Sequence, residues 1–131
     1  MGLMHVLNPD DPVLEEPAAR DLFDKILGTD HLFLFVMEEE GALLASCYLI
    51  ISQNLTRGGA PFATIENVVT AKEARRKGYG KAIIHHARDK ARELGCYKIM
   101  LMTGSKTPGT HKFYRECGFD PDAKTAYLMR P

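Results

Sequence analysis

The sequence lacks the features that mark membrane proteins, secreted proteins and disulfide or metal frameworks. Its three cysteines, Cys47, Cys96 and Cys117, are odd in number and widely spaced, which fits neither a disulfide framework nor a metal site. No apolar run reaches the roughly 18 residues that cross a bilayer. The N-terminus shows no basic segment followed by an apolar one, as a secretory signal would. We therefore expect a cytoplasmic protein with no membrane partner and no bound metal.

An excess of charge of one sign is also absent. The 17 basic and 17 acidic residues give a formal net charge of +0. Affinity for nucleic acid comes largely from neutralising phosphates, so this balance argues against a nucleic-acid partner bound through bulk charge. The remaining composition, 45% hydrophobic and 26% charged over 131 residues, is typical of a soluble protein with its own core. We expect a single domain over residues 1–131.

The apolar pattern predicts the elements of the first half. Residues 4–7 suit a short edge strand, and residues 13–27 have the spacing of an amphipathic helix that Gly28 ends. Residues 32–37 and 42–51 are apolar and are joined by a polar turn, which predicts a hairpin. After a glycine-containing loop, residues 62–70 alternate and are rich in β-branched side chains, as in a strand.

The second half contains the clearest helix, residues 78–94. Its apolar side chains fall on one face: Ile83, Ile84, Ala87, Ala91 and Leu94. A strand is predicted over residues 97–103. Thr107 and Pro108 have the residue types of an N-cap and first helical position, and this helix ends at Gly118. With a last short strand at residues 126–129, the order of elements predicts a mixed α/β sheet domain.

A basic, glycine-containing loop precedes the clearest helix. A helix start exposes unpaired N–H groups and the positive end of the helix dipole, and glycine lets the backbone approach a ligand closely. The loop therefore suits a phosphate group, although a solvated basic helix start is an alternative. It matches neither the nucleotide P-loop pattern nor the three-glycine dinucleotide fingerprint. Its basic side chains are Arg75, Arg76, Lys77 and Lys81.

This loop, Arg75-x-x-Gly78-x-Gly80, resembles the Gln/Arg-x-x-Gly-x-Gly/Ala signature of GNAT N-acetyltransferases. The resemblance implies a mixed, mostly antiparallel central sheet with a splayed CoA-binding strand pair, flanked by helices, and acetyl-CoA as the acetyl donor. It also implies two sets of donor contacts. Backbone near Val68, Val69 and Thr70 would pair with the pantetheine arm. The backbone of Arg76, Lys77, Gly78, Tyr79, Gly80 and Lys81 would hold the pyrophosphate, beside the basic side chain of Arg75.

A second segment, residues 107–119, agrees with the first. Its sequence T-P-G-T-H-K-F-Y-R-E-C-G-F is similar to the family's Asn-x-x-Ala-x-x-Phe-Tyr-x-x-x-Gly-Phe pattern. Thr107 and Thr110 replace the usual Asn and Ala, so the CoA contact of that Asn would pass to Thr107 or Ser105. The resemblance extends from about residue 32 onward.

The resemblance also implies catalytic roles. Tyr114 stands where many members carry a tyrosine that protonates the leaving CoA thiolate, and an O–H donor stabilises that developing charge. The alternative is a packing tyrosine beside Phe113. Glu66 is a candidate general base, directly or through water; the alternative is a carboxylate that binds the acceptor or has a structural role. Strand alternation puts the next residue, Asn67, on the opposite face.

Asn54 and Arg57 lie in the loop before that strand and are candidates for acceptor binding, with Arg57 suited to a carboxylate or phosphate. The alternative is an exposed hairpin loop. His85 and His86 are adjacent on a helix, point in different directions and predict no metal site. His111 is expected at the surface; the alternative is that it approaches the site, since it lies on the predicted helix of Tyr114.

The sequence thus predicts direct transfer of an acetyl group from acetyl-CoA to a primary amine, most simply that of a small molecule. Residues 66–67 and 96–98 locally resemble glucosamine-phosphate acetyltransferases, which suggests an amino sugar phosphate. The alternatives are acetylation of a protein N-terminus or lysine, a non-catalytic CoA-binding regulatory module, and an RNA-binding basic loop. A homodimer is a further expectation, since dimers are common in the family.

Overall fold

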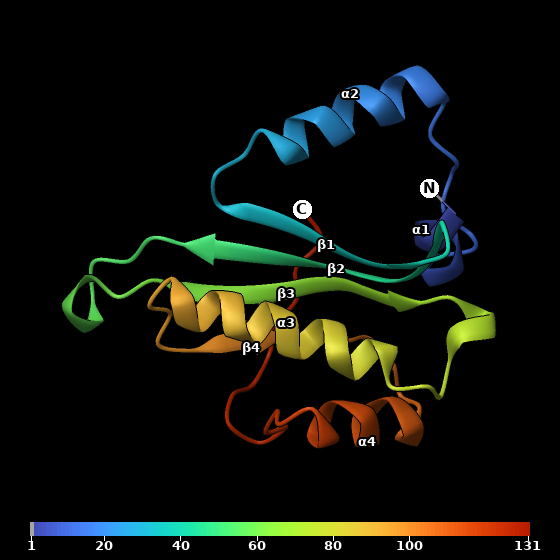
Figure 1. Ribbon diagram of the computed structural model, residues 1–131. Coiled ribbons are helices and arrows are strands. Elements are labelled where there is room, and N and C mark those ends of the chain that lie inside the picture. The colour runs from blue at the N-terminus through green and yellow to red at the C-terminus, as the bar shows by residue number, and fades with distance from the viewer. Residues whose placement is uncertain (1) are drawn as a thin grey trace. The chain divides into compact units, whose positions relative to one another are not determined.

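The computed structural model describes residues 2–131 and contains five principal elements in its central part. These are the strands β1 (Leu32–Glu39), β2 (Ala42–Ser52), β3 (Phe62–Thr70) and β4 (Ile99–Leu101), with helix α3 (Tyr79–Glu93) before β4 (Figure 1). Helices α1 (Gly2–Leu7) and α2 (Glu16–Leu27) precede them, and α4 (Pro108–Glu116) follows. Two 3₁₀ turns, η1 (Arg57–Gly59) and η2 (Lys72–Ala74), flank β3. The chain divides into two compact units, Met1–Leu101 and Met102–Pro131.

The four strands form one sheet in the order β1-β2-β3-β4. β1 pairs with β2 and β2 with β3 in antiparallel fashion, whereas β3 and β4 are parallel. This confirms the predicted hairpin and the mixed, mostly antiparallel sheet. The parallel pairing is confined to Ala63–Ile65 against Ile99–Leu101. Among residues 2–131, the rest of β3 therefore has no strand partner on its outer side, as a splayed strand pair requires.

Helix α3 covers one face of this sheet and forms the core with it (Figure 1). Leu49 and its cross-strand partner Ile65 are fully buried on this face, and burying such side chains stabilises the fold by about 1.5–3 kcal/mol each. The ring of Phe35 on β1 meets His86 of α3 edge-on, 4.7 Å between centroids. The predicted apolar face of the helix is confirmed except at its end, where Leu94 is 39% exposed; its buried members are Ile83, Ile84, Ala87 and Ala91.

A β-bulge interrupts β3 immediately after Glu66. Ser46 pairs with Val69 and Tyr48 with Glu66, so Cys47 alone stands opposite both Asn67 and Val68. Asn67 has a φ of 52°, a left-handed conformation that Asn tolerates better than most residues. A bulge bends the strand and re-aims its side chains. The alternation that separated Asn67 from Glu66 in the sequence therefore does not hold.

Some predicted boundaries were wrong at the two ends of the chain. Residues 4–7 are part of helix α1, not a strand, because Leu3, Val6 and Leu7 recur at helical spacing. Residues 126–129 form no strand; Tyr127 is 92% exposed, and a strand needs a partner that alternation alone does not supply. Helix α2 begins at Glu16 rather than residue 13, since Pro17 is favoured in the first turn.

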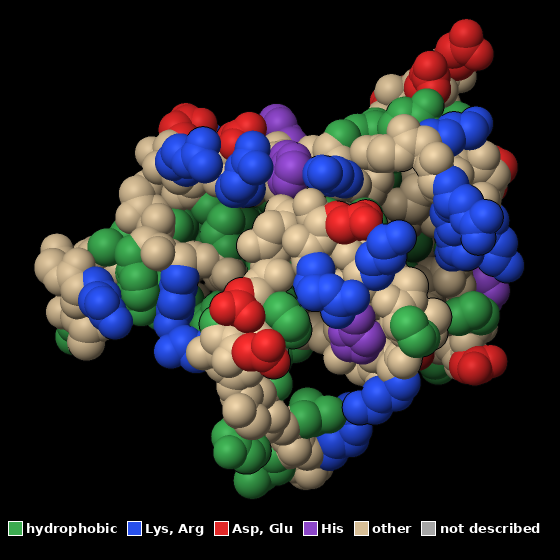
Figure 2. Space-filling view, turned by 90° about the horizontal axis from the view of Figure 1, so that it is seen from below, with side chains coloured by type: hydrophobic (Ala, Val, Ile, Leu, Met, Phe, Trp, Pro, Cys, Tyr) green, Lys and Arg blue, Asp and Glu red, His purple; other side chains and the backbone are tan. Residues whose placement is uncertain are grey.

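The strand predicted over residues 97–103 is limited to β4, three residues long. Within residues 2–131, no helix has the length and apolar character to span a bilayer. Lysine, arginine and acidic side chains are interspersed over the surface seen in Figure 2, in keeping with the zero net charge.

Candidate active site

The loop between β3 and α3 has the backbone that phosphate binding requires. After Thr70, Ala71 donates its N–H to the Leu44 carbonyl at 2.8 Å, which ties the end of β3 to β2. The chain then turns through two left-handed residues, Arg76 with φ 65° and Gly78 with φ 84°, and Gly78 becomes the N-cap of α3. No side chain among residues 2–131 forms a cap hydrogen bond at this helix start. The N–H groups of its first turn are therefore left for a ligand.

The basic side chains around this loop are exposed, and no ion pair within residues 2–131 occupies them. They are Lys72, Arg75, Arg76, Lys77 and Lys81. Arg75 does donate from Nε to the Thr70 carbonyl at 3.4 Å, which directs its side chain back along β3.

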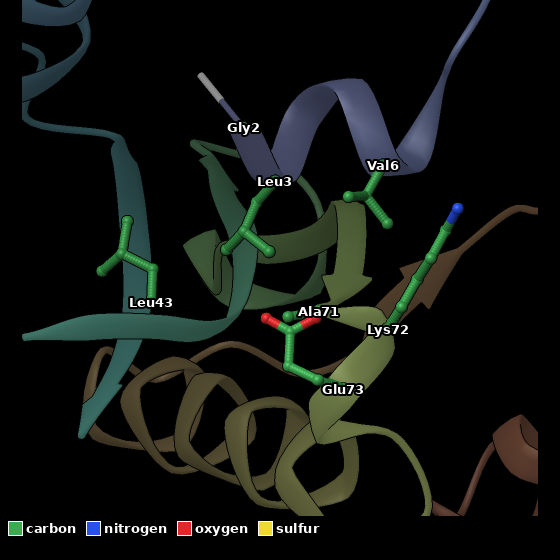
Figure 3. Close-up of a pocket in the computed structure, with 7 residues that line it drawn as sticks. All are labelled: Gly2, Leu3, Val6, Leu43, Ala71, Lys72 and Glu73. Atoms are coloured by element: carbon green, nitrogen blue, oxygen red, sulfur yellow. The ribbon is translucent and has the colours of Figure 1, made fainter. Parts of the chain in front are cut away.

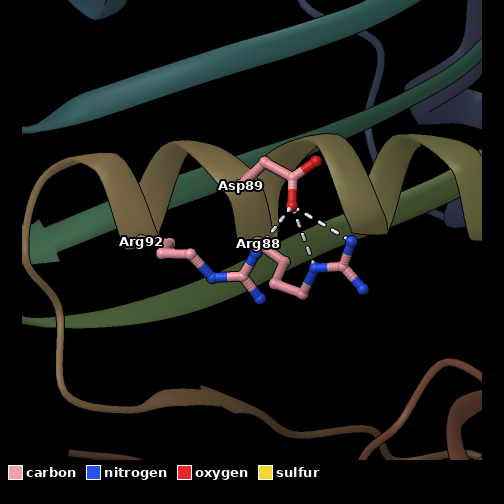
Figure 4. Close-up of polar contacts among 3 residues, drawn as sticks. All are labelled: Arg88, Asp89 and Arg92. Carbon is pink, nitrogen blue, oxygen red and sulfur yellow. Dashed lines mark hydrogen bonds and ion pairs between the residues drawn. The ribbon is translucent and has the colours of Figure 1, made fainter.

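The far half of α3 differs from its start. There Asp89 forms ion pairs with Arg88 at 3.0 Å and Arg92 at 3.7 Å (Figure 4), and Lys90 lies 3.5 Å from Glu93. The cations at the helix end are thus paired with acids of the same helix, whereas those at its start are available to an anion.

Tyr79, the first residue of α3, is turned away from its own loop. Its hydroxyl donates to Oε2 of Glu39 at 3.2 Å, and this hydrogen bond, followed by the charge of Glu39, raises the pKa of Tyr79. The side chain links α3 to the end of β1, so only the backbone of Tyr79 is left for the predicted pyrophosphate contact.

The predicted contacts of the pantetheine arm lie on the unpaired edge of β3. Val69 and Thr70 pair with β2 on one side, and the pairing with β4 on the other side has already ended at Ile65. The side chain of Val69 is buried and those of Val68 and Thr70 are half-buried, so the contact of their backbone with a pantetheine arm stays a prediction.

Glu66 lies on the sheet face opposite α3. Its neighbour Ile65 is on the α3 face, and its cross-strand partner is Tyr48. Both Glu66 and Tyr48 are half-buried. No hydrogen bond or ion pair from the described residues engages the Glu66 carboxylate, so it is available to bind or deprotonate an amine. Sequence reasoning missed Tyr48, because only the hairpin register shows that it stands beside Glu66.

The two other predicted acceptor residues behave differently from each other. The Asn54 amide donates to the carbonyls of Thr56 at 3.3 Å and Ala60 at 3.2 Å, and its Oδ1 accepts from the N–H and hydroxyl of Thr56. Asn54 therefore shapes its own loop. Arg57 is exposed, has a φ of 54° and holds its guanidinium 5.3 Å from the ring centroid of Tyr97.

The second unit contains the predicted residues Thr107 and Tyr114. Thr107 is the N-cap of α4 as predicted, but its side chain forms no cap hydrogen bond. Its N–H instead donates to the hydroxyl of Ser105 at 3.2 Å. Tyr114 is half-buried, with ring contacts to Phe113 at 5.1 Å and Phe119 at 6.3 Å.

His111, expected at the surface, is partly covered by its neighbours. It is half-buried, and its Nε2 lies 2.8 Å from the carbonyl oxygen of Ser105. The hydroxyl of Ser105 in turn donates to Thr110 at 3.2 Å. His111 and Ser105 together fix the segment that leads into α4.

A pocket of about 400 Å³ lies between α1, β2 and η2 (Figure 3). Leu3 and Val6 project from α1 into it, and the carboxylate of Glu73 points toward them. None of the predicted site residues lines it. Its lining is Gly2, Leu3, Val6, Leu43, Ala71, Lys72 and Glu73. Across residues 2–131, no cluster of three or more His, Cys, Asp or Glu side chains is arranged to hold a metal.

Residues 1–119 match the sequence profile of the Acetyltransferase (GNAT) family. The chain belongs to the GNAT acetyltransferase family. The members of this family are acyltransferases, and this chain is therefore an acyltransferase enzyme. The GNAT family uses acetyl-CoA, which agrees with the unsatisfied N–H groups and unpaired cations at the start of α3.

Named relatives of this GNAT chain include glucosamine 6-phosphate N-acetyltransferases. Glucosamine 6-phosphate N-acetyltransferase 1 of Oryza sativa subsp. japonica is 33% identical over 122 residues, 91% of this chain and 72% of the rice protein. Glucosamine 6-phosphate N-acetyltransferase of Trypanosoma brucei brucei is 35% identical over 66% of this chain and 56% of that protein. A putative acetyltransferase from Agrobacterium tumefaciens str. C58 has a TM-score of 0.94 and 42% identity, covering 99% of this chain and 90% of its own.

The GNAT site residues predicted from sequence are distributed unevenly. β3, its loop and α3 place Glu66, residues 68–70 and residues 75–81 along one continuous stretch of the first unit, which also contains Asn54 and Arg57. Thr107 and Tyr114 belong to the second unit. The roles of these residues remain predictions.

Proposed function

We propose that this enzyme transfers the acetyl group of acetyl-CoA directly to the primary amine of a phosphorylated amino sugar such as glucosamine 6-phosphate. The observation that carries the proposal is the half-buried carboxylate of Glu66, which has no partner among residues 2–131 and lies on a strand that runs directly into the basic loop. A carboxylate there suits a protonated amine, and the loop suits the pyrophosphate of the donor. The named relatives favour an amino sugar phosphate as the acceptor.

In the proposed reaction the acceptor amine first loses a proton to Glu66, directly or through a water molecule. Its nitrogen lone pair then attacks the thioester carbonyl. A C–N bond forms, the C–S bond breaks, and the sulfur leaves as a thiolate. The hydroxyl of Tyr114 gives the thiolate a proton, and the second proton that the attacking nitrogen must lose restores that hydroxyl, so that free CoA and a neutral acetamide are released. No acyl-enzyme is needed, because the amine attacks the bound donor in a ternary complex.

The donor would be held by the chain's own backbone. Residues 68–70 offer N–H and C=O groups to the pantetheine arm, and the first turn of α3 offers N–H groups to the pyrophosphate. The cations Arg75, Arg76, Lys77 and Lys81 would supply the opposite charge. In the second unit, the hydroxyl of Thr107 is the candidate for a further CoA contact, since that of Ser105 is already bonded to Thr110.

Free-thiol release from acetyl-CoA tests the proposal directly. We expect the highest kcat/KM with glucosamine 6-phosphate among a panel that also contains glucosamine, a lysine peptide and a peptide with a free N-terminus. Transfer to a peptide alone would favour a protein acetyltransferase instead. Binding of acetyl-CoA without turnover on any amine would favour the non-catalytic CoA-binding module.

Glu66→Gln tests the role of the carboxylate. Loss of a general base typically costs about 100-fold or more, so we expect kcat to fall by that order while the binding of acetyl-CoA changes little. Glu38→Gln, at an exposed position of β1, is the matched control and should leave the rate unaltered. Equal rates for the two variants would reject Glu66 as the base.

The proposal includes a cytoplasmic location and a homodimer. Sedimentation of the purified protein would check the second of these.

A further inference from the structure

The first turn of α3 lacks the apolar anchors that hold the rest of this helix on the sheet. The buried residues of α3 are Gly80, Ile83, Ile84, Ala87 and Ala91. Since Gly80 has no side chain, the first buried side chain of the helix is that of Ile83. Lys81 and Ala82 are exposed. The turn that offers its N–H groups to a pyrophosphate, residues 79–82, therefore has no fully buried side chain of its own.

Tyr79 supplies an attachment for this turn. It is the first residue of α3, and its hydroxyl donates at 3.2 Å to Oε2 of Glu39, the last residue of β1. The two residues are 40 positions apart in the chain. A charged acceptor makes such a hydrogen bond roughly twice as strong as one between neutral groups. Because the hydrogen bond raises the pKa of Tyr79, the hydroxyl stays a donor at neutral pH. We call this hydrogen bond the Tyr79–Glu39 link.

The carboxylate end of the link is itself on a fixed part of the backbone. Glu39 pairs with Ala42 where the β1–β2 hairpin closes. Glu40 and Gly41 between them have φ of 51° and 80°, the left-handed pair that a tight two-residue hairpin turn requires. At the entrance of the basic loop, the N–H of Ala71 bonds to a carbonyl of β2. Both ends of the loop are thus tied to the same hairpin.

We propose that Tyr79 and Glu39 are positioning residues for the acetyl donor: their link holds the first turn of α3 in the arrangement that binds the pyrophosphate of acetyl-CoA. The inference rests on the donor site of the proposed function and not on the identity of the amine. A helix start without this link would have to be ordered when the donor binds, and the cost of that ordering lowers the affinity. In this role neither side chain contacts the donor.

Calorimetry with acetyl-CoA tests the link. The loss of one hydrogen bond changes an equilibrium constant by about fivefold, so we expect Tyr79→Phe and Glu39→Ala each to raise the Kd of acetyl-CoA by that factor. The double variant Y79F/E39A should bind no more weakly than either single variant, because all three lack the same bond. Glu39→Gln keeps an acceptor for the hydroxyl and should retain most of the affinity. Glu38→Ala, at the exposed neighbouring residue, is the matched control and should bind acetyl-CoA normally.

A donor without a pyrophosphate distinguishes positioning from a general loss of structure. S-Acetylpantetheine has the same thioester but no phosphate, so the link should not affect its use. With glucosamine 6-phosphate as the acceptor, the ratio of kcat/KM for acetyl-CoA to that for S-acetylpantetheine should fall about fivefold in Tyr79→Phe. The fall should come from a higher KM for acetyl-CoA, with kcat unaltered. An equal loss with both donors would overturn the positioning role.

The outcomes separate this inference from the proposed function. If Tyr79→Phe binds acetyl-CoA as tightly as the unmodified protein, the link has no positioning role and the donor site stands. If the variants bind more weakly as expected but the unmodified protein acetylates no amine, the link is supported and only the proposed function fails. If the unmodified protein does not bind acetyl-CoA, both fail. Should Tyr79→Phe not fold, Glu39→Ala, at an exposed residue, takes its place in both measurements.

Discussion

At the scale of single residues, the type of side chain was predictable but its partners were not. Asn54 and Glu66 were both candidates for the acceptor site, yet the structure commits the amide of Asn54 to its own loop, whereas no residue among 2–131 forms a hydrogen bond or ion pair with the Glu66 carboxylate. Tyr48 was missed because its position beside Glu66 depends on strand register. Such pairings join residues far apart in the chain, and no local pattern encodes them.

Tyr114→Phe distinguishes a thiolate-protonating role from simple packing. The ring keeps its contacts with Phe113 and Phe119, and only the hydroxyl is lost. If the hydroxyl protonates the leaving sulfur, kcat should fall about 100-fold with little change in the affinity for acetyl-CoA. Tyr127→Phe, at a side chain 92% exposed, is the control. Pre-steady-state rates equal to those of this control would assign Tyr114 to packing alone.

The buried thiol of Cys47 leads us to predict a loss of stability at alkaline pH. Burial raises the pKa of its thiol from 9.0 to about 12. Between these values the unfolded chain releases the proton and the native state keeps it, so the free energy of unfolding falls as the pH rises. Denaturant unfolding at pH 8 and pH 10.5 under reducing conditions should show this decrease. Cys47→Ala should lose less stability over the same interval; an equal loss would assign the effect to other groups.

At the scale of elements, prediction succeeded where the local pattern and the tertiary structure agree. Strand β3 has the predicted bounds, and α3 differs by one residue at each end. Prediction failed at residues 4–7 and 126–129, where short apolar runs carry too little periodicity to distinguish helix, strand and loop. The bulge at Asn67 was also missed, because it is set by the pairing of β3 with β2. It is this bulge that ends the simple alternation just beyond Glu66.

The predicted binding of the CoA pyrophosphate at the start of α3 can be tested with a pair of glycine variants. Gly78 and Gly95 stand before and after the helix with nearly equal φ, 84° and 82°, and open space at the Cβ position. Aspartate at either position therefore meets similar backbone strain, and at Gly78 its charge is favourable to the helix dipole. We expect Gly78→Asp to remain folded but to lose acetyl-CoA binding, measured by calorimetry. Gly95→Asp should bind acetyl-CoA normally, and equal affinities would move the pyrophosphate away from this loop.

At the scale of the whole molecule, zero net charge hides a local asymmetry. The acidic and basic residues cancel over the chain, and the ion pairs of α3 lie in its second half. The cations before and within its first turn are left without acidic partners among the described residues. The net charge of the chain therefore does not indicate whether a polyanionic ligand such as acetyl-CoA binds. The local distribution of ion pairs does, because it shows which cations are left for such a ligand. This distribution could not be derived from composition, because it depends on which side chains meet.

Acetyl-CoA should therefore raise the thermal stability of the whole protein. A ligand that binds only the native state stabilises it by about 2.7 kcal/mol at a hundredfold excess over its Kd. For a chain of this size that corresponds to a rise in Tm of roughly 10 °C. Differential scanning calorimetry over a range of acetyl-CoA concentrations should show Tm rising with the logarithm of concentration. Gly78→Asp supplies the control, because its Tm should stay constant while that of Gly95→Asp rises as in the unmodified protein. A Tm of the unmodified protein that does not move at millimolar acetyl-CoA would contradict donor binding at the start of α3, and with it the proposed transfer from acetyl-CoA to an amine.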